Sequence, residues 1–235
     1  KKAIEKAIAT LKAYKDGKRN LESRIVEEER WWKLRHWDMI RGQSSKAMTG
    51  QEARPEPTSA WLFNSIANKH ADMMDNYPEP NVLPRERQDE QDAKVLGAIL
   101  PVIFQRRQYE KTYSQAAWYK LKHGAAAKGV FWNKELEHGL GDIDIRNLDL
   151  LNLFWEPGIT DLQASRNLFV VDLQDNEVLE QAYPQLKGKT QGQIIDVKQY
   201  VYDDNVDVSG KSVVVDWYYR KKTRLGQTVL HYCKF

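Results

Sequence analysis

The hydrophobic period of the chain changes at Gly124. Before this residue, apolar side chains recur every three or four positions, a pattern typical of amphipathic helices. After it, apolar and polar residues alternate in short runs bounded by glycine and proline, a pattern typical of half-buried strands. Helices followed by strands predict an α+β fold: N-terminal amphipathic helices, then a helical segment packed on a mostly antiparallel sheet.

The chain begins with two amphipathic stretches. A short helix is expected over residues 2–15 and is predicted to end at Asp16-Gly17, because glycine suits the position just past a helix end. A longer and highly charged helix is expected over 18–40. The next residues are polar and contain glycine and proline, so they predict a linker. The chain would thus divide into a helical arm (1–41), a linker loop (42–57) and an α+β domain (58–235).

Three more helices are predicted before the strands. The first covers about 60–75, with Ser59 as its N-cap. The second begins at residue 89 or 90 and contains Pro101, which is expected to kink or split it. The third covers about 107–123. The side chains expected to face the core from the first two of these helices are Trp61, Leu62, Ile66, Met73, Ala93, Leu96, Ile99, Leu100 and Ile103.

The stretch from Gly139 to Pro184 forms a module of closely spaced strands and turns. Glu156-Pro157-Gly158 predicts a turn, because proline presets φ and glycine accepts a positive φ. Asp161 can cap a short helical turn after it. The elements expected in and around this module are strands at 130–132, 143–148, 150–155 and 168–173, and a helix at 176–183 that Pro184 stops. Farther on come an acidic turn at 203–207 and a hairpin formed by 213–219 and 229–235.

The composition indicates a globular protein without a membrane span. Apolar residues make up 41% and charged residues 29% of the 235 residues, and the mean hydropathy is −0.69. No apolar run approaches ~18 residues. Cys233 is the single cysteine, so an internal disulfide is excluded. The net charge of +3 is too small by itself to indicate a surface that binds a polyanion.

The chain has no motif for catalysis or for cofactor binding. It lacks the phosphate loop G-x-x-x-x-G-K-[ST], and Gly139-Leu140-Gly141 lacks the third glycine of a dinucleotide loop. The five histidines have no metal-ligand spacing with one another or with Cys233. We therefore expect no catalytic residue, no cofactor and no metal.

One set of carboxylates supports an alternative function. Nucleases hold two metal ions with clustered carboxylates. Here such a cluster would take Asp142, Asp144, Asp149, Glu156 and Asp216. No lysine at the usual nuclease spacing accompanies them, and alternating acids on a strand are typical of its solvated face. A metal-dependent enzyme that processes nucleic acid stays open as the alternative to a structural protein.

Several stretches of the chain resemble portal proteins of tailed bacteriophages and prophages. SAWLFNSIANKHADMMDNYPEPNVLPRERQDEQDAKVL resembles the start of their core, where a helix ends in D-N-x-P-x-P and P-x-x-x-x-D leads into the next helix. GDIDIRNLDLLNLFWEPGITDLQASRNLFV and VLEQAYP resemble the following strand, F-W turn and Y-P helix stop, and VVVDWYYRKK with TVLHYCKF resembles the next hairpin. The matching positions are Asp75, Asn76, Pro78, Pro80, Pro84, Asp89, Phe154, Trp155, Glu156, Pro157, Tyr183 and Pro184. The resemblance covers about residues 58–235 and corresponds to the wing of a portal subunit.

This resemblance implies a structural protein and not an enzyme. Portal proteins form a ring, usually a dodecamer, at one capsid vertex, and double-stranded DNA is packaged and later ejected through it. The implied partners are other copies of the chain, terminase, the major capsid or scaffold protein and the head-tail adaptor, with no membrane. The implied location is the virion, after synthesis in the bacterial host cytoplasm.

The stem, clip and crown of a portal are not found in the sequence, so we expect a fragment of a longer chain. Another virion structural protein with the same α+β body stays open as a further alternative to the portal.

Overall fold

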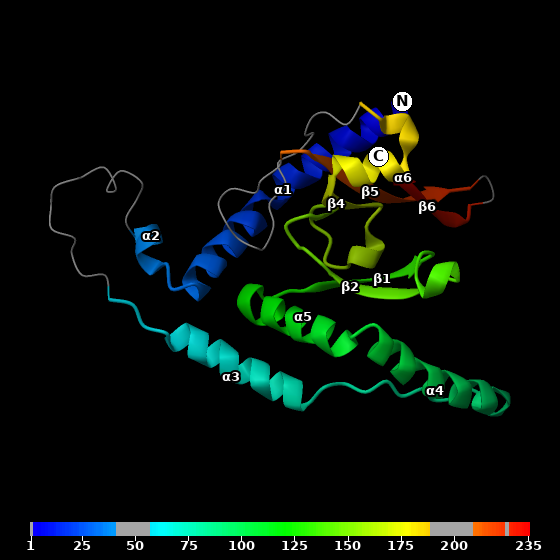
Figure 1. The fold of residues 1–235 in the computed structure, drawn as a ribbon. Coiled ribbons are helices and arrows are strands. Elements are labelled where there is room, and N and C mark those ends of the chain that lie inside the picture. The colour runs from blue at the N-terminus through cyan, green and yellow to red at the C-terminus, as the bar shows by residue number, and fades with distance from the viewer. Residues whose placement is uncertain (1, 41–56, 189–208, 224–225) are drawn as a thin grey trace. The chain divides into compact units, whose positions relative to one another are not determined.

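The computed structural model describes residues 2–40, 57–188, 209–223 and 226–235. They form helices and antiparallel strands (Figure 1), which confirms the predicted α+β class. The chain divides into two compact units, one of Lys1–Val26 with Leu148–Phe235 and one of Glu27–Asn147. We call them the sheet unit and the helical unit. The predicted linker, apart from Pro57, and the predicted acidic turn lie outside the described residues.

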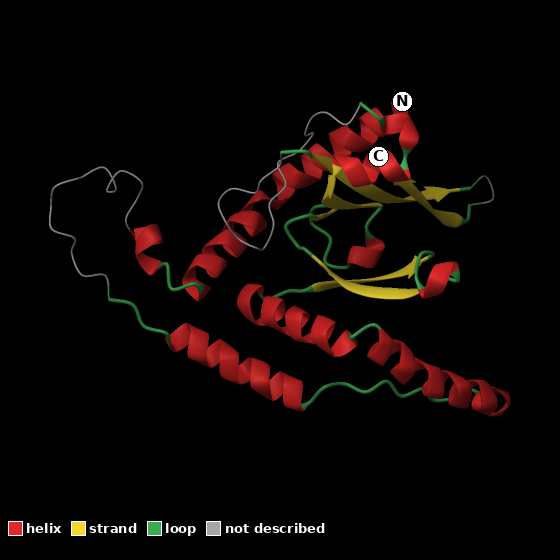
Figure 2. Ribbon diagram, in the orientation of Figure 1, coloured by secondary structure: helices red, strands yellow, loops and turns green. Residues whose placement is uncertain are grey.

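Four strands form the antiparallel sheet of the sheet unit (Figure 2), in the order β3-β4-β5-β6. Their bounds are β3 Leu153–Trp155, β4 Asn167–Asp175, β5 Lys211–Lys222 and β6 Thr228–Lys234. Phe154 lies opposite Phe169, and Phe169 lies opposite Trp217, so aromatic side chains share one face of three strands. The strand predicted at 168–173 and the C-terminal hairpin are confirmed, whereas the strand predicted at 150–155 is shortened to β3 because residues 150–152 form a turn.

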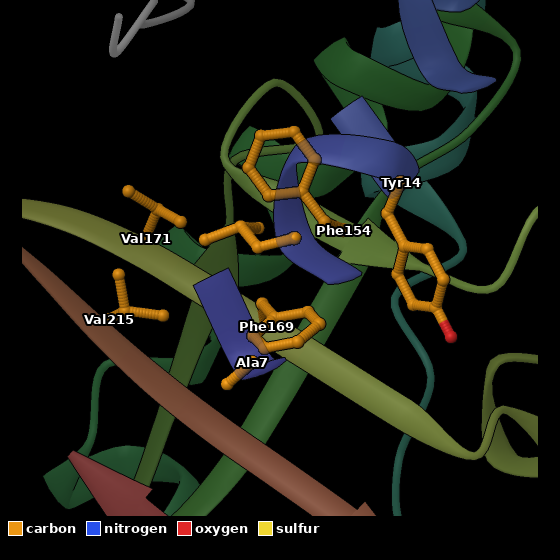
Figure 3. Packing of buried hydrophobic residues seen from close by; sticks show 7 residues of the cluster. Ala7, Tyr14, Phe154, Phe169, Val171 and Val215 are labelled. Carbon is orange, nitrogen blue, oxygen red and sulfur yellow. The ribbon is translucent and has the colours of Figure 1, made fainter. Parts of the chain in front are cut away.

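The first helix covers this aromatic face. In α1 Lys2–Trp32, Ala7, Leu11 and Tyr14 follow one another by three or four residues and therefore share one side of the helix. Figure 3 shows them in one buried cluster with Phe154, Phe169, Val171 and Val215. Leu11 and Phe169 are completely buried. The sheet unit is thus a helix packed on a sheet, and the segment that holds the helix lies far from the strands in the sequence.

α1 runs without interruption through Asp16-Gly17, so the predicted helix end at this pair is wrong. A Cβ atom on Gly17 would lie 2.7 Å from Cγ of Pro157, and this close approach explains the glycine. The helix ends at Trp32 and not at residue 40, because Leu34 takes a left-handed φ of 59°. The short helix α2 His36–Ile40 follows this break.

The helical unit contains three long helices and a small sheet within its described residues. The bounds are α3 Trp61–Asp75, α4 Glu90–Arg106, α5 Tyr109–His123, β1 Ala127–Asn133 and β2 Asp142–Leu148. α5 contacts both α3 and α4, and β1 pairs with β2. These elements confirm the predicted helices to within two residues at their starts. No helix in the described ranges combines the length and the apolar character needed to cross a membrane.

Short elements complete the two units. They are α6 Asn176–Ala182 and the 3-10 turns η2 Arg87–Asp89, η3 Glu137–Gly139, η4 Leu162–Ala164 and η5 Pro184–Leu186. The side chain of Asp161 accepts a hydrogen bond from the backbone N–H of Gln163 at 2.8 Å, which confirms the predicted cap of η4.

Two predicted details at the helix ends are corrected by the structure. The N-cap of α3 is Ala60, which has no capping side chain, and not Ser59. α4 is not split at Pro101 but continues to Arg106.

The apolar sides of α3 and α4 also differ from the prediction. Trp61 exposes 80% of its surface, and Leu62 is nearly half exposed. Leu96 and Ile99 are also about half exposed, although all four were predicted to face the core. Periodicity finds the apolar side of a helix, but only the surrounding chain decides whether that side is covered.

Alanine is expected to have opposite effects at Gly17 and at Gly97. At Gly17 the new methyl group would meet the Pro157 ring, so the backbone must shift, and we expect a loss of about 1–3 kcal/mol. Gly97 lies inside α4 with nothing within 4 Å of its Cβ position, so alanine should stabilise the protein by about 1 kcal/mol. Denaturant unfolding of both variants measures the two effects, and a change of the same sign at both positions would contradict the expectation.

Candidate functional site

Lys18 is a buried cation beneath β3. It lies on the buried side of α1, so the helix carries the ammonium group into the core of the sheet unit. Its Nζ donates hydrogen bonds to the backbone carbonyl of Leu150 and, at 2.8 Å, to that of Leu153. A side chain on the helix thus satisfies two carbonyl groups of the segment that leads into the F-W turn.

Aromatic rings of the F-W turn surround the same ammonium group. Nζ of Lys18 lies 4.4 Å from the ring centroid of Phe154 and 5.4 Å from that of Trp155, within the range of cation–π attraction. Burial lowers the pKa of Lys18 from 10.5 to about 8, although the nearby carboxylates of Glu22 and Asp149 act in the opposite direction. The Phe154-Trp155 pair is therefore organised around a cation from a distant helix.

Glu156 holds the next part of the turn through Arg166. The Nε atom of Arg166 lies 3.1 and 3.0 Å from the two carboxylate oxygens, and Nη2 donates to one of them as well. The hydroxyl of Ser165 accepts from the backbone N–H of Glu156 at 3.1 Å and donates to the carbonyl of Asn167 at 2.6 Å. The hydrogen bond from Arg166 lowers the pKa of Glu156. Pro157 then meets α1 at Gly17.

The D-N-Y-P segment ends α3 and joins an aromatic cluster. Asn76 is the C-cap of α3, and its amide donates to the carbonyl of Asp72 at 2.9 Å. The ring of Tyr77 meets that of Tyr113 edge-on, with centroids 5.4 Å apart. Pro80 and Tyr77 line a groove of about 760 Å³. The other predicted members are Asp75, the last residue of α3, and Pro78 and Pro84 in the segment without helix or strand that follows.

The Y-P pair ends α6 as predicted. The backbone N–H of Tyr183 donates to the carbonyl of Leu179 at 2.8 Å, which closes the last turn of the helix. Pro184 opens η5, a position that needs no backbone N–H. The portal-like positions therefore serve as helix ends, turns and core residues, some of them in the helical unit and the others in the sheet unit.

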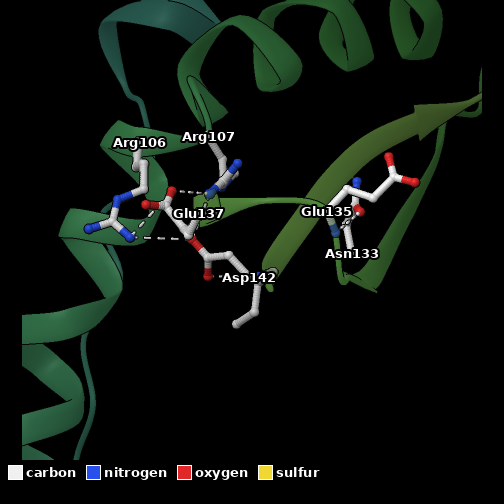
Figure 4. A network of polar contacts seen from close by, with 7 residues as sticks. Arg106, Arg107, Asn133, Glu135, Glu137 and Asp142 are labelled. Carbon is white, nitrogen blue, oxygen red and sulfur yellow. Dashed lines mark hydrogen bonds and ion pairs between the residues drawn. The ribbon is translucent and has the colours of Figure 1, made fainter. Parts of the chain in front are cut away.

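Four of the five carboxylates considered as metal ligands are held by other groups, namely Asp142, Asp149, Glu156 and Asp216. Asp142 accepts a hydrogen bond from Nη2 of Arg107 at 2.6 Å, and Glu137 accepts from the same guanidinium at 2.8 Å (Figure 4). Arg106 adds a further contact to Asp142 at 3.4 Å. The hydrogen bond from Arg107 lowers the pKa of Asp142. The side chain of Asp142 is only 13% exposed, so the expected solvated strand face is wrong at this position.

The carboxylates of the sheet unit have structural partners too. Asp149 accepts a hydrogen bond from the backbone N–H of Leu151 at 2.8 Å, and Asp216 accepts one from the hydroxyl of Tyr232 at 2.6 Å. No group of three or more His, Cys, Asp or Glu side chains in the described part of the chain could hold a metal ion. Four of the five carboxylates that a metal-dependent enzyme would use thus form ion pairs or hydrogen bonds, and the five do not form a two-metal centre within the described residues.

Reasoning from the sequence did not identify Lys18 as the residue that joins α1 to the F-W turn. The signal for it was present, because Lys18 follows Leu11 and Tyr14 at helical spacing and so puts a cation on an apolar side. The predicted helix end at Gly17 concealed this pattern.

Comparison with protein families agrees with the resemblance found in the sequence. The family described as phage P22-like portal protein matches residues 33–232, a range that includes most of both units and all of the portal-like positions. No curated protein sequence matches the chain. Because the family match covers more than half of the chain, the chain belongs to the phage P22-like portal proteins, a family of structural and not enzymatic proteins of the phage capsid.

Proposed function

We propose that this chain is the wing-like body of a portal subunit, in a ring that conducts double-stranded DNA into and out of the capsid. The observation that carries the proposal is the family match over residues 33–232. In this proposal residues 58–235 form the α+β domain, 1–41 form an N-terminal arm whose helix α1 packs on the sheet of that domain, and 42–57 connect the two. The ring would dock terminase during packaging and the head-tail adaptor afterwards, with the major capsid or scaffold protein around it.

The internal contacts of the sheet unit support a structural role in which the subunit keeps its shape. Two of its charged side chains form hydrogen bonds within the unit: Lys18 donates to backbone carbonyls, and Glu156 accepts from Arg166. None of Lys18, Glu156 and Arg166 lines the groove of about 760 Å³ beside Tyr77. A subunit that guides DNA needs a shape that persists under force, and buried ion–carbonyl and aromatic contacts provide one.

The portal-like positions have a defined part in this proposal. Phe154 and Trp155 anchor β3 on α1, and Glu156 with Pro157 sets the exit of the chain from that strand. Asn76 and Pro80 direct the chain from α3 towards α4. We infer that they act through the path of the backbone and not by touching DNA.

Ring assembly tests the proposal. The complete protein, as its gene encodes it, is expected to form a closed ring with a central hole in negative-stain images and a single large oligomer in native mass spectrometry. Heterologous contacts that close on themselves produce such rings. A strict monomer at high concentration would contradict the proposal. As a control for the enzymatic alternative, DNA incubated with the protein and Mg²⁺ or Mn²⁺ should stay intact, and cleavage that disappears in Asp144→Ala would reverse the preference.

A further inference from the structure

α4 carries an apolar stripe that the helical unit leaves uncovered. Val95, Leu96, Ile99 and Val102 are each about half exposed, and Ala93 is the buried residue of this helix. Residues 95, 99 and 102 follow one another by three or four positions, so they lie on one side of the helix. Leu96 lies beside this line, three residues before Ile99. Four half-exposed aliphatic side chains so close together on one helix are more than the scattered apolar residues of an ordinary surface.

A second exposed apolar patch lies at the start of α3. Trp61 exposes 80% of its surface and Leu62 43%. One and two turns farther along the same side of the helix lie Ser65 and Lys69, which are both exposed. Tryptophan is among the residues most enriched in the centres of protein interfaces. An exposed tryptophan beside an exposed leucine is therefore a natural anchor for a partner surface.

The two patches are located on different parts of the same unit. In Figure 1, α3 begins at one end of the three long helices, and α4 lies at the other end of the group. α5 contacts both helices and holds them in place. A contact between unlike patches of neighbouring copies is heterologous, and this is the kind of contact that builds a ring.

The charges beside the patches match when the two helices are antiparallel. Lys69 lies seven residues after Leu62, and Asp92 lies seven residues before Ile99, about 10.5 Å along each axis at ~1.5 Å per residue. An antiparallel pair that places Leu62 over Ile99 therefore places Lys69 over Asp92. Both charged side chains are exposed, and the pairing brings opposite charges together. Trp61 then lies over the turn of α4 that carries Val102.

We propose that the apolar stripe of α4 in one copy of this chain packs, antiparallel, against the start of α3 in the next copy. The proposal rests on the ring proposed above and names the surfaces that join its subunits. Leu62 and Trp61 fill the space between Ile99 and Val102, and the ion pair of Lys69 with Asp92 sets the register. Aliphatic and aromatic side chains supply the affinity, and the charges select the orientation.

Disulfide cross-linking between two variants tests the pairing. The complete protein with Cys233→Ser is prepared as two single-cysteine variants, Leu62→Cys and Ile99→Cys, which are mixed, assembled and oxidised. A disulfide in the mixture can form only between copies, and we expect a covalent dimer on a non-reducing gel that each variant alone lacks. Val178→Cys, on the exposed face of α6, replaces Leu62→Cys in the matched control and should give no dimer with Ile99→Cys.

Charge reversal tests the register separately. Lys69→Glu places two acids opposite each other and is expected to raise the protein concentration for half assembly roughly threefold or more. Adding Asp92→Lys to the same chain should restore assembly. Lys94→Glu makes the same change on another side of α4 and should leave assembly unchanged, and circular dichroism checks that each variant is folded.

The outcomes separate this inference from the proposed function. A ring that forms without the disulfide overturns the α3–α4 pairing and leaves the ring in place. A dimer from Ile99→Cys alone indicates that α4 packs on a second α4, and it overturns the pairing as well. A monomer without any disulfide overturns both proposals. If the expected disulfide forms but the protein assembles only into dimers and not into a closed ring, the α3–α4 pairing is supported and the ring is overturned.

Discussion

Phe169→Ala is expected to lower the free energy of unfolding by about 3–5 kcal/mol, the largest effect of a single substitution in this protein. Phe169 has no exposed surface, and it is the central member of the cluster that joins α1 to the sheet. Tyr14 meets its ring edge-on with centroids 5.9 Å apart, and Trp217 lies on the neighbouring strand with centroids at 6.0 Å. Alanine would leave a cavity between the two layers of the unit, which are α1 and the sheet.

Urea unfolding followed by tryptophan fluorescence and by circular dichroism measures this loss. Val178→Ala is the matched control, because Val178 is 57% exposed in the same unit and should change stability by less than about 0.5 kcal/mol. A loss below about 1 kcal/mol for Phe169→Ala would show that the helix does not pack on the sheet as described. Trp155→Ala should lower the free energy of unfolding by less than Phe169→Ala does, because Trp155 is only partly buried.

Lys18→Met is expected to destabilise the protein at pH 7 by about 1–3 kcal/mol, with a deficit that grows at higher pH. The methionine fills the volume of the lysine stem but leaves the carbonyls of Leu150 and Leu153 without their buried donor. Lys12→Met, on the exposed side of α1, is the control and should change stability by less than about 0.5 kcal/mol at pH 7.

The pH dependence follows from the lowered pKa of Lys18. Between about 8 in the folded protein and 10.5 in the unfolded chain, the unfolded state binds the proton and the folded state does not. Stability of the parent protein therefore rises with pH in this window, because the neutral amine still donates its hydrogen bonds without the cost of a buried charge. Relative to Lys18→Met, the gain amounts to about 3 kcal/mol at ~1.4 kcal/mol per pKa unit. A constant difference between the two proteins across this window would contradict the buried-cation interpretation.

Local sequence patterns were sufficient for most of the secondary structure after residue 60. The helices α3, α4 and α5 and the strands β4, β5 and β6 appear within a few residues of their predicted positions, since their period and punctuation depend on neighbouring residues alone. The turn at Glu156-Pro157 and the helix stop at Pro184 were predictable for the same reason. These local signals also carried the portal resemblance, because it consists of such turns and stops at matching intervals.

Contacts between distant residues could not be predicted in this way. The glycine of Asp16-Gly17 was interpreted as a helix end, and only the ring of Pro157, far along the chain, shows that it allows a close approach. The role of Lys18 depends on the carbonyls of Leu150 and Leu153 in the same manner. Asp142 became a counter-ion and not a metal ligand because α4 ends beside it with Arg106 and Arg107.

The sequence by itself determined the α+β class, the order of the elements and the resemblance to the portal family that the portal-like motifs carry. The tertiary structure alone decided which apolar sides are covered. α1 and α4 both carry an apolar side, but Leu11 of α1 is completely buried, whereas Ile99 of α4 stays about half exposed. The physical reason is that periodicity places apolar side chains on one side of a helix, while their burial depends on a second surface that comes from elsewhere in the chain or from another copy.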